Sequence, residues 1–223
     1  MQERPTLIIV GSVGAGKGTQ ADLLVEQLGY LKVEAGEIFR QKAKEDSPLG
    51  RKVKEINDTG RYADDQLITE LVDDYIKDVP ARKGILLDGY PRTIGQAEML
   101  SNLLQESGRD PENIIVIWIK VSREEAKRRL MNRSTCTVCK TVYMSRDVLT
   151  CLHCGGDVKP REYDKPEAIE RRLEFFEQEV MPLIKYYQQK NKTLEINGEQ
   201  EIAHVFDEIK EKSGSYLNGE DSV

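Results

Sequence analysis

The sequence lacks long apolar runs, and this limits the kinds of protein that it can encode. Its longest uninterrupted apolar stretch is residues 114–119, six residues in a chain of 223. A helix that spans a bilayer needs about 20 such residues. Only four consecutive apolar residues lead into Gly11, too few for the apolar region of a secretory signal. We therefore expect no transmembrane helix and a cytoplasmic protein.

Positive charge is also in short supply. The chain has 33 Lys and Arg residues against 39 Asp and Glu residues, a formal net charge of −6. A protein that coats nucleic acid needs a basic face, so this balance argues against nucleic acid as the partner. It leaves room for a local basic pocket that binds an anion. Short apolar runs throughout the chain exclude wholesale disorder, and the length suits one domain with sizeable insertions.

Cysteine is absent outside one short segment. The four cysteines form two C-x-x-C pairs separated by 11 residues: Cys136, Cys139, Cys151 and Cys154. Such pairs can present four thiolates tetrahedrally to zinc. Two disulfides would need an oxidising compartment that nothing else in the sequence supports, and a redox dithiol would need only one pair. The pattern favours a structural zinc site, with His153 between the ligands but facing solvent.

Short buried strands alternate with helical patterns. We expect strands at residues 6–10, 85–87 and 114–119 and helices at 19–28 and 94–104. This order predicts an α/β fold, a mostly parallel sheet covered by helices on both faces. Two polar stretches interrupt it and are read as insertions. The expected organisation is core at 1–33, 64–133 and 162–212, inserts at 34–63 and 134–161, and a flexible tail at 213–223.

A long helix is expected after residue 163. Asp164 is the predicted N-cap, with Pro166 in the first turn and Glu167 completing a capping-box-like pair. Apolar residues then recur at helical spacing, and Pro182 is expected to kink the helix.

Residues 11–19, GSVGAGKGT, fit the phosphate-binding pattern G-x-x-x-x-G-K. They stand between a predicted strand and a predicted helix, the context that the motif requires. Glycines let successive N–H groups point at phosphate oxygens, and the helix N-terminus adds partial positive charge. Lys17 would contact the terminal phosphates, and the fold would be of the P-loop NTPase type. A plain glycine-rich turn is the alternative.

Gly18 follows Lys17 directly, and the residue that carries a hydroxyl, Thr19, comes one position later. Together with D-G-Y-P-R-T at residues 88–93, this resembles the nucleoside monophosphate kinases, adenylate kinases above all, over residues 5 to about 212. The cysteine segment resembles the zinc-bearing lid of many bacterial members. The resemblance implies reversible Mg²⁺-dependent transfer from ATP to AMP, giving two ADP, with residues 34–63 as the nucleoside-monophosphate insert and a monomer or small homo-oligomer.

The resemblance also implies roles for individual residues. Catalysis would rest on positioning and charge stabilisation, by Lys17, Asp88, Arg92, Arg129, Arg133, Arg161 and Arg172. The ATP-binding residues would be Gly14, Ala15, Gly16, Lys17, Gly18, Thr19, Arg129, Arg133, Tyr143 and Gln200. The AMP-binding residues would be Ala35, Arg40, Arg61, Ala63, Gly89, Arg92, Gln96, Arg161 and Arg172. Arg129 and Arg133, one helical turn apart, are expected to converge on one ligand.

Two observations bear on the acceptor base in opposite directions. Ala35 stands where adenylate kinases usually carry a threonine that helps to read adenine. An alanine at this position is more like the uridylate/cytidylate kinases. Gln96 matches the position that hydrogen-bonds the acceptor adenine, and we favour AMP on this ground. The alternatives are a UMP/CMP kinase, a kinase with broad donor specificity because Met144 replaces a usual histidine, and, from another class, a non-catalytic P-loop or zinc-ribbon binding protein.

Overall fold

A five-stranded parallel sheet forms the centre of the molecule. The computed structural model describes residues 4–59, 63–161 and 164–214, and the strand order in this part of the chain is β2-β3-β1-β4-β8. All four strand pairs are parallel, which confirms the predicted α/β fold. The strands are β1 (Thr6–Val10), β2 (Leu31–Glu34), β3 (Ile85–Asp88), β4 (Ile114–Lys120) and β8 (Thr193–Asn197).

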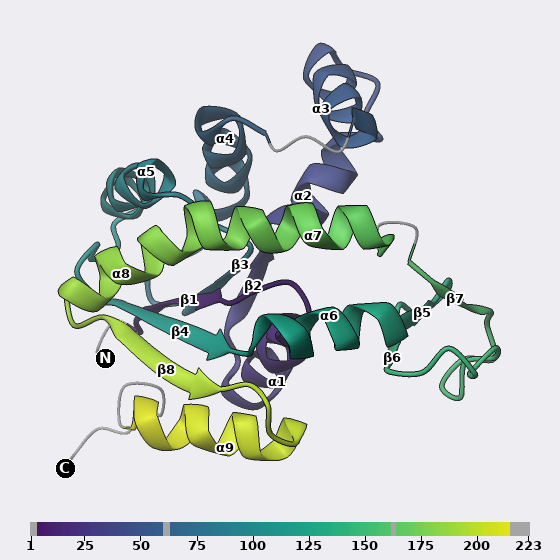
Figure 1. Ribbon diagram of the computed structural model, residues 1–223. Coiled ribbons are helices and arrows are strands. Elements are labelled where there is room, and N and C mark those ends of the chain that lie inside the picture. The colour runs from purple at the N-terminus through teal and green to yellow at the C-terminus, as the bar shows by residue number, and fades with distance from the viewer. Residues whose placement is uncertain (1–3, 60–62, 162–163, 215–223) are drawn as a thin grey trace.

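Helices cover both faces of this sheet (Figure 1). Side chains alternate across β1, so that Leu7 and Ile9 pack on one face and Ile8 and Val10 on the other. The first face is covered by α1 (Lys17–Leu28) and α9 (Ile202–Ser213). The second is covered by α4 (Asp65–Ile76), α5 (Ile94–Glu106) and α8 (Met181–Gln189). Every residue of β1 is buried, which accounts for the apolar run that follows Thr6.

Two segments extend from this core (Figure 1). The first contains α2 (Ala35–Lys42) and α3 (Pro48–Thr59), which pack with α4 around Val53. The second is the lid segment, residues 134–161, whose small antiparallel sheet has the order β6-β5-β7. Its strands are β5 (Ser134–Cys136), β6 (Val142–Tyr143) and β7 (Val158–Pro160). The lid follows α6 (Arg123–Asn132) and precedes α7 (Pro166–Phe175).

Strands β2 and β8 were not predicted from the sequence. Both are edge strands of the sheet; β2 has one buried and three half-buried positions, and β8 mixes buried with exposed positions. An edge strand has only one strand neighbour, so it tolerates polar residues such as Lys32 and Glu195. The apolar run that identifies a central strand is therefore missing from both.

The helix after residue 163 differs from expectation at its start. Lys165, not Asp164, is the N-cap of α7, and it makes no side-chain capping bond. The prediction of an Asp164 cap is wrong because this carboxylate instead binds two arginines, Arg133 and Arg172. Pro166 is in the first turn, as predicted.

The predicted kink near Pro182 takes the form of a wide turn. The path from α7 to α8 passes through a π-helical segment, Phe176–Val180, in which the Met181 N–H donates to the Phe176 carbonyl five residues earlier. Proline has no N–H, and its ring would collide with the carbonyl of Gln178 in a regular helix. The wider turn immediately before Pro182 removes this conflict.

The C-terminal end of the described chain is ordered by packing. Ser213, where the sequence places the start of the tail, is the last residue of α9 and is fully buried. Its hydroxyl donates to the Ile209 carbonyl at 2.5 Å. Most of the predicted tail, residues 215–223, lies outside the described residues. Among the helices that the structure describes, none has the length and apolar content needed to cross a membrane.

Candidate functional site

The loop between β1 and α1 has the geometry of a phosphate cradle. Gly16 is the N-cap of α1 with a left-handed φ of 93°. Gly14 has a φ of 84°, and a Cβ at this position would lie 2.8 Å from the Ala126 carbonyl oxygen of α6. Only glycine fits both positions without strain. The loop therefore directs the first N–H groups of α1, which have no partner within the helix, toward one point.

Lys17 lies over this loop. Its ammonium group donates to the carbonyls of Gly11 and Ser12, both at 2.9 Å. Burial lowers the pKa of Lys17 to about 8, Asp88 opposes this shift, and Arg92, Arg172 and Arg133 lower the pKa further. The charges of three arginines therefore act on Lys17 at this loop, which favours the binding of an anion there.

Asp88 is the neighbouring carboxylate. It ends β3 and pairs in register with Ile9 of β1, so it stands at the carboxyl edge of the sheet where ligands bind in such folds. Burial raises the pKa of Asp88, and the charge of Lys17 acts against this rise. The sheet thus brings Lys17 and Asp88 together from segments about 70 residues apart in the chain.

Asp164 draws two of the predicted arginines together. It accepts from Nε and Nη2 of Arg133, both at 2.9 Å, and from Nη1 of Arg172 at 3.1 Å. Arg161 donates from Nε to the Thr135 hydroxyl at 2.8 Å. Burial lowers the pKa of Arg161, Asp164 raises it, and Arg172 and then Arg40 lower it. These arginines therefore share one electrostatic environment.

Arg129 has different partners. Its Nε donates to Glu125 at 2.6 Å and its Nη2 to the Gly198 carbonyl at 2.8 Å. Among the hydrogen bonds of the described residues, Arg129 and Arg133 share no partner. The reason is local: α6 ends at Asn132, and Arg133 is its C-cap with an extended backbone, so helical spacing no longer relates the two side chains.

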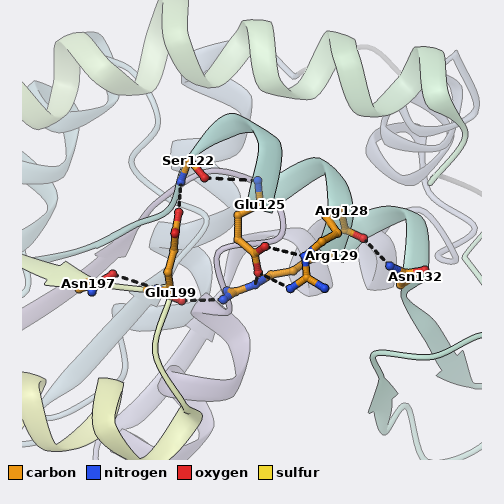
Figure 2. A network of polar contacts seen from close by, with 8 residues as sticks. Ser122, Glu125, Arg128, Arg129, Asn132, Asn197 and Glu199 are labelled. Atoms are coloured by element: carbon orange, nitrogen blue, oxygen red, sulfur yellow. Dashed lines mark hydrogen bonds and ion pairs between the residues drawn. The ribbon is translucent and has the colours of Figure 1, made fainter.

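Figure 2 shows how the loop after β8 is tied to the start of α6. The Glu199 carboxylate accepts the Ser122 backbone N–H at 2.7 Å, and the Ser122 hydroxyl accepts the Glu125 N–H at 3.3 Å. Gln200 donates its side-chain amide to Asn197 O and to Glu208. The loop that contains Gly198 and Gln200 is thus held beside Arg129.

The predicted acceptor residues lie around the ends of β2 and β3. Arg92 donates from Nε to the Gly89 carbonyl at 2.8 Å, and Arg40 donates to Glu37 and Glu34 at 2.8 and 3.1 Å. Gln96 is 6% exposed. Ala35 is buried at the start of α2, and Ala63 is partly buried against Val53, Leu67 and Leu71. Arg61 lies outside the described residues.

The four cysteines form one cluster in the lid segment. Their Sγ atoms all lie within 4.8 Å of one another, and the shortest separations, Cys136–Cys154 and Cys139–Cys151, are 3.5 Å. Zinc–sulfur bonds of about 2.3 Å in a tetrahedron require sulfurs about 3.8 Å apart. All four are free thiols, which rules out the two-disulfide alternative in this structure. The cluster can hold one metal ion.

Two further lid residues are placed by this cluster. His153 is exposed, as predicted. The Tyr143 hydroxyl donates to Cys151 Sγ at 3.2 Å and accepts the Leu152 N–H at 2.9 Å. The structure therefore places the hydroxyl of Tyr143 in the cysteine cluster and not at the phosphate loop.

Sequence reasoning missed the carboxylates that hold these groups, namely Glu125, Asp164, Glu199 and Asp65, which accepts the Gln96 side-chain amide. Asp164 reads only as a helix cap, the other three lie in no recognisable motif, and the chain has 39 acidic residues. A signal existed only for Glu125, which is four residues before Arg129 on a helix.

Comparison with known proteins gives a consistent result. A family model described as adenylate kinase matches residues 9–192. The chain is 36% identical over 213 residues to the adenylate kinase of Bacillus velezensis, covering 93% of this chain and 97% of the relative. It is 37% identical over 210 residues to the adenylate kinase of Methanocella arvoryzae, with 91% and 95% coverage. It is also 37% identical over 209 residues to that of Caldanaerobacter subterraneus subsp. tengcongensis, with 92% and 94% coverage.

Proposed function

The chain belongs to the adenylate kinase family, and from this premise we propose how its own residues carry out phosphoryl transfer from ATP to AMP, giving two ADP. The observation that carries the proposal is that Lys17 at the phosphate loop feels the charges of Arg92, Arg133 and Arg172, with Asp88 as the opposing carboxylate. Phosphoryl transfer between nucleotides needs no protein nucleophile, because the AMP phosphate oxygen that attacks is already ionised. Positioned positive charge is therefore the principal requirement.

The donor phosphates bind at the loop. The N–H groups of residues 14–19 surround them, and Lys17 exchanges its carbonyl partners for the terminal phosphates. Arg129 and the loop around Gln200 lie where the donor base would be held. The support for this role is the direct bond from Arg129 to the Gly198 carbonyl.

The acceptor binds between the insert and α5. Arg40 and Arg92 hold its phosphate, because a planar guanidinium binds two phosphate oxygens at once. Gln96 reads the base, and Ala35, Arg61, Ala63 and Gly89 complete the pocket. In the structure Arg40 is held by Glu34 and Glu37, and an incoming phosphate would compete with these carboxylates.

The phosphoryl group lies among Arg133, Arg161 and Arg172 during its transfer. Asp164 holds two of these arginines before the nucleotides arrive, so little reorganisation is needed as charge develops. Asp88 would hold Mg²⁺ through water, and this ion would neutralise charge on the donor phosphates. Closure of the lid and of the 34–63 insert would exclude water as a competing acceptor.

The lid metal is zinc, with a structural role. Four thiolates are a soft, tetrahedral donor set that suits this ion. The described lid has a very small core, in which Val158 packs with two of the cysteines, so the metal supplies stability that apolar packing cannot. Free thiols that serve as ligands fit a reducing compartment, and we propose the cytoplasm.

The test is the reverse reaction. Purified protein with Mg²⁺ and ADP as the sole nucleotide should form ATP and AMP in equal amounts. No product from folded, zinc-loaded protein would contradict the proposal. The UMP/CMP alternative is tested by supplying AMP, CMP, UMP and GMP in turn with ATP. It predicts faster turnover of UMP than of AMP.

A further inference from the structure

Gln96 is held by two groups that each accept only one orientation of its amide. Its Nε2 donates to Asp65 Oδ1 at 2.8 Å, and its Oε1 accepts the Arg92 backbone N–H at 2.7 Å. A carboxylate can only accept hydrogen bonds, and a backbone N–H can only donate. A flipped amide would place oxygen against oxygen and N–H against N–H. The amide orientation is therefore set by the protein before any base binds.

Asp65 is itself held firmly in this position. Its Oδ2 accepts the Thr93 hydroxyl at 2.7 Å, and the same hydroxyl accepts the Gln96 backbone N–H at 3.1 Å. A Cβ on Gly95 would lie 2.8 Å from Asp65 Oδ2, so a side chain at this position would push the carboxylate away. The first residue of α4 is thus bonded to the first turn of α5.

A second contact fixes the spacing of the same two helices. The Tyr90 hydroxyl donates to the Gln96 backbone carbonyl at 3.1 Å and lies 2.9 Å from the Thr69 hydroxyl of α4. Tyr90 is 1% exposed. Because this buried side chain is bonded to both helices, it fixes the distance between α4 and α5, and with it the distance between Asp65 and Gln96.

We propose that Asp65 determines the class of base that the acceptor site takes, by holding the Gln96 amide in one orientation. The proposal rests on the proposed role of Gln96 in reading the acceptor base. Among the described residues, the two bonds leave one Nε2 hydrogen and one lone pair of Oε1 for a ligand.

The chemistry of the bases gives this orientation its consequence. Adenine and cytosine present an amino donor beside a ring-nitrogen acceptor, whereas guanine and uracil present a carbonyl acceptor beside a ring N–H donor. When the phosphate of the nucleotide is bound, the base can present only one edge to the Gln96 amide, in one orientation. An amide that cannot flip matches one of these two classes and opposes the other. With AMP as the proposed acceptor, the class that this orientation matches is the amino bases, and the oxo bases are opposed.

The experiment separates the acceptor oxygen of Asp65 from its charge. Asp65→Ala removes both, whereas Asp65→Asn removes the charge but can still offer an oxygen to Gln96 Nε2. Glu70→Gln is the control for charge loss on α4, since this exposed residue pairs only with Gln66 among the hydrogen bonds of the described chain. Each protein is assayed for kcat/KM with AMP, CMP, GMP and UMP at saturating ATP, and for the KM of ATP.

The expected readout is the ratio of kcat/KM for AMP to that for GMP. It should fall about tenfold in Asp65→Ala, because the loss of one hydrogen-bond acceptor frees the amide to flip, and stay near the unmodified value in Asp65→Asn and Glu70→Gln. The KM of ATP should be unchanged in all three. An unchanged ratio in Asp65→Ala, or equal losses in the Ala and Asn variants, would overturn the proposal. Failure of the unmodified protein to use AMP would instead overturn the proposed function.

Discussion

Asp164 and Arg133 form a two-pronged ion pair at the base of the lid. Both carboxylate oxygens of Asp164 bind the Arg133 guanidinium, at 2.9 Å from Nε and 2.9 Å from Nη2. The Asp164 side chain has no exposed surface, and that of Arg133 is 15% exposed. The pair joins the end of α6 to a residue two positions before α7, so it connects the two points at which the lid leaves the core.

Replacing Asp164 by Asn should destabilise the protein strongly. It leaves the buried charge of Arg133 without its carboxylate, and removal of one partner from a buried pair costs about 3–5 kcal/mol. Chemical unfolding gives the free energy directly. Asp157→Asn is the matched control, because this lid carboxylate is exposed and pairs only with Lys159 in the described chain. Equal stability of the two variants would show that the Asp164 pair contributes nothing.

Activity should fall at alkaline pH as Lys17 loses its charge. Its pKa in the folded chain without nucleotide is about 8 against an ordinary value of 10.5. A profile of kcat/KM for ATP reports groups of the free enzyme and should decline above pH about 8. The profile of kcat should decline at higher pH, because bound phosphates favour the charged amine. A flat kcat/KM profile through pH about 9 would contradict this assignment.

The same group gives a stability effect of known sign. Between pH about 8 and 10.5, the unfolded chain keeps the Lys17 proton and the folded chain has lost it. The unfolded state then binds more protons, so this group makes stability rise with pH in that window. Comparison of the unfolding free energy with that of Lys17→Met isolates the contribution, and a fall with pH attributable to Lys17 would contradict the assignment.

Loss of the lid metal should affect stability more than chemistry. Metal analysis should find about one zinc ion per chain. Cys136→Ser should lose this zinc and unfold at a lower temperature, because the metal replaces a core in the lid. His153→Ala is the control and should retain full zinc content, since His153 is exposed. Zinc loss in the control would place His153 among the ligands.

Replacing Glu199 by Ala should weaken the binding of ATP and leave the binding of AMP unaffected. The carboxylate ties the loop after β8 to the Ser122 N–H, and this bond lowers the pKa of the Glu199 carboxyl. Without it the Gly198 carbonyl no longer holds Arg129 in place. We expect the KM of ATP to rise about fivefold. Glu195→Ala, a surface pair with Lys120, should leave both KM values unchanged, and an equal rise in the KM of AMP would refute a donor-specific role.

Much of the fold and site could be predicted because the signals are contiguous. The phosphate loop is a run of nine residues between an apolar strand and a helix, and the cysteines lie within 19 residues. Strands β1, β3 and β4 are buried on both faces and therefore read as apolar runs. The edge strands β2 and β8 could not be read in this way, because each has only one fully buried residue.

Residue types and local spacing were enough to determine the class of fold, the phosphate loop and the cysteine cluster. Which carboxylate holds which functional group was decided only in three dimensions. Asp65 and Gln96 are 31 residues apart, as are Arg133 and Asp164, and Ser122 and Glu199 are 77 apart. An acidic side chain has the same chemistry at every position in a sequence. Its role depends on whether the fold buries it and which donors the fold brings within hydrogen-bond distance.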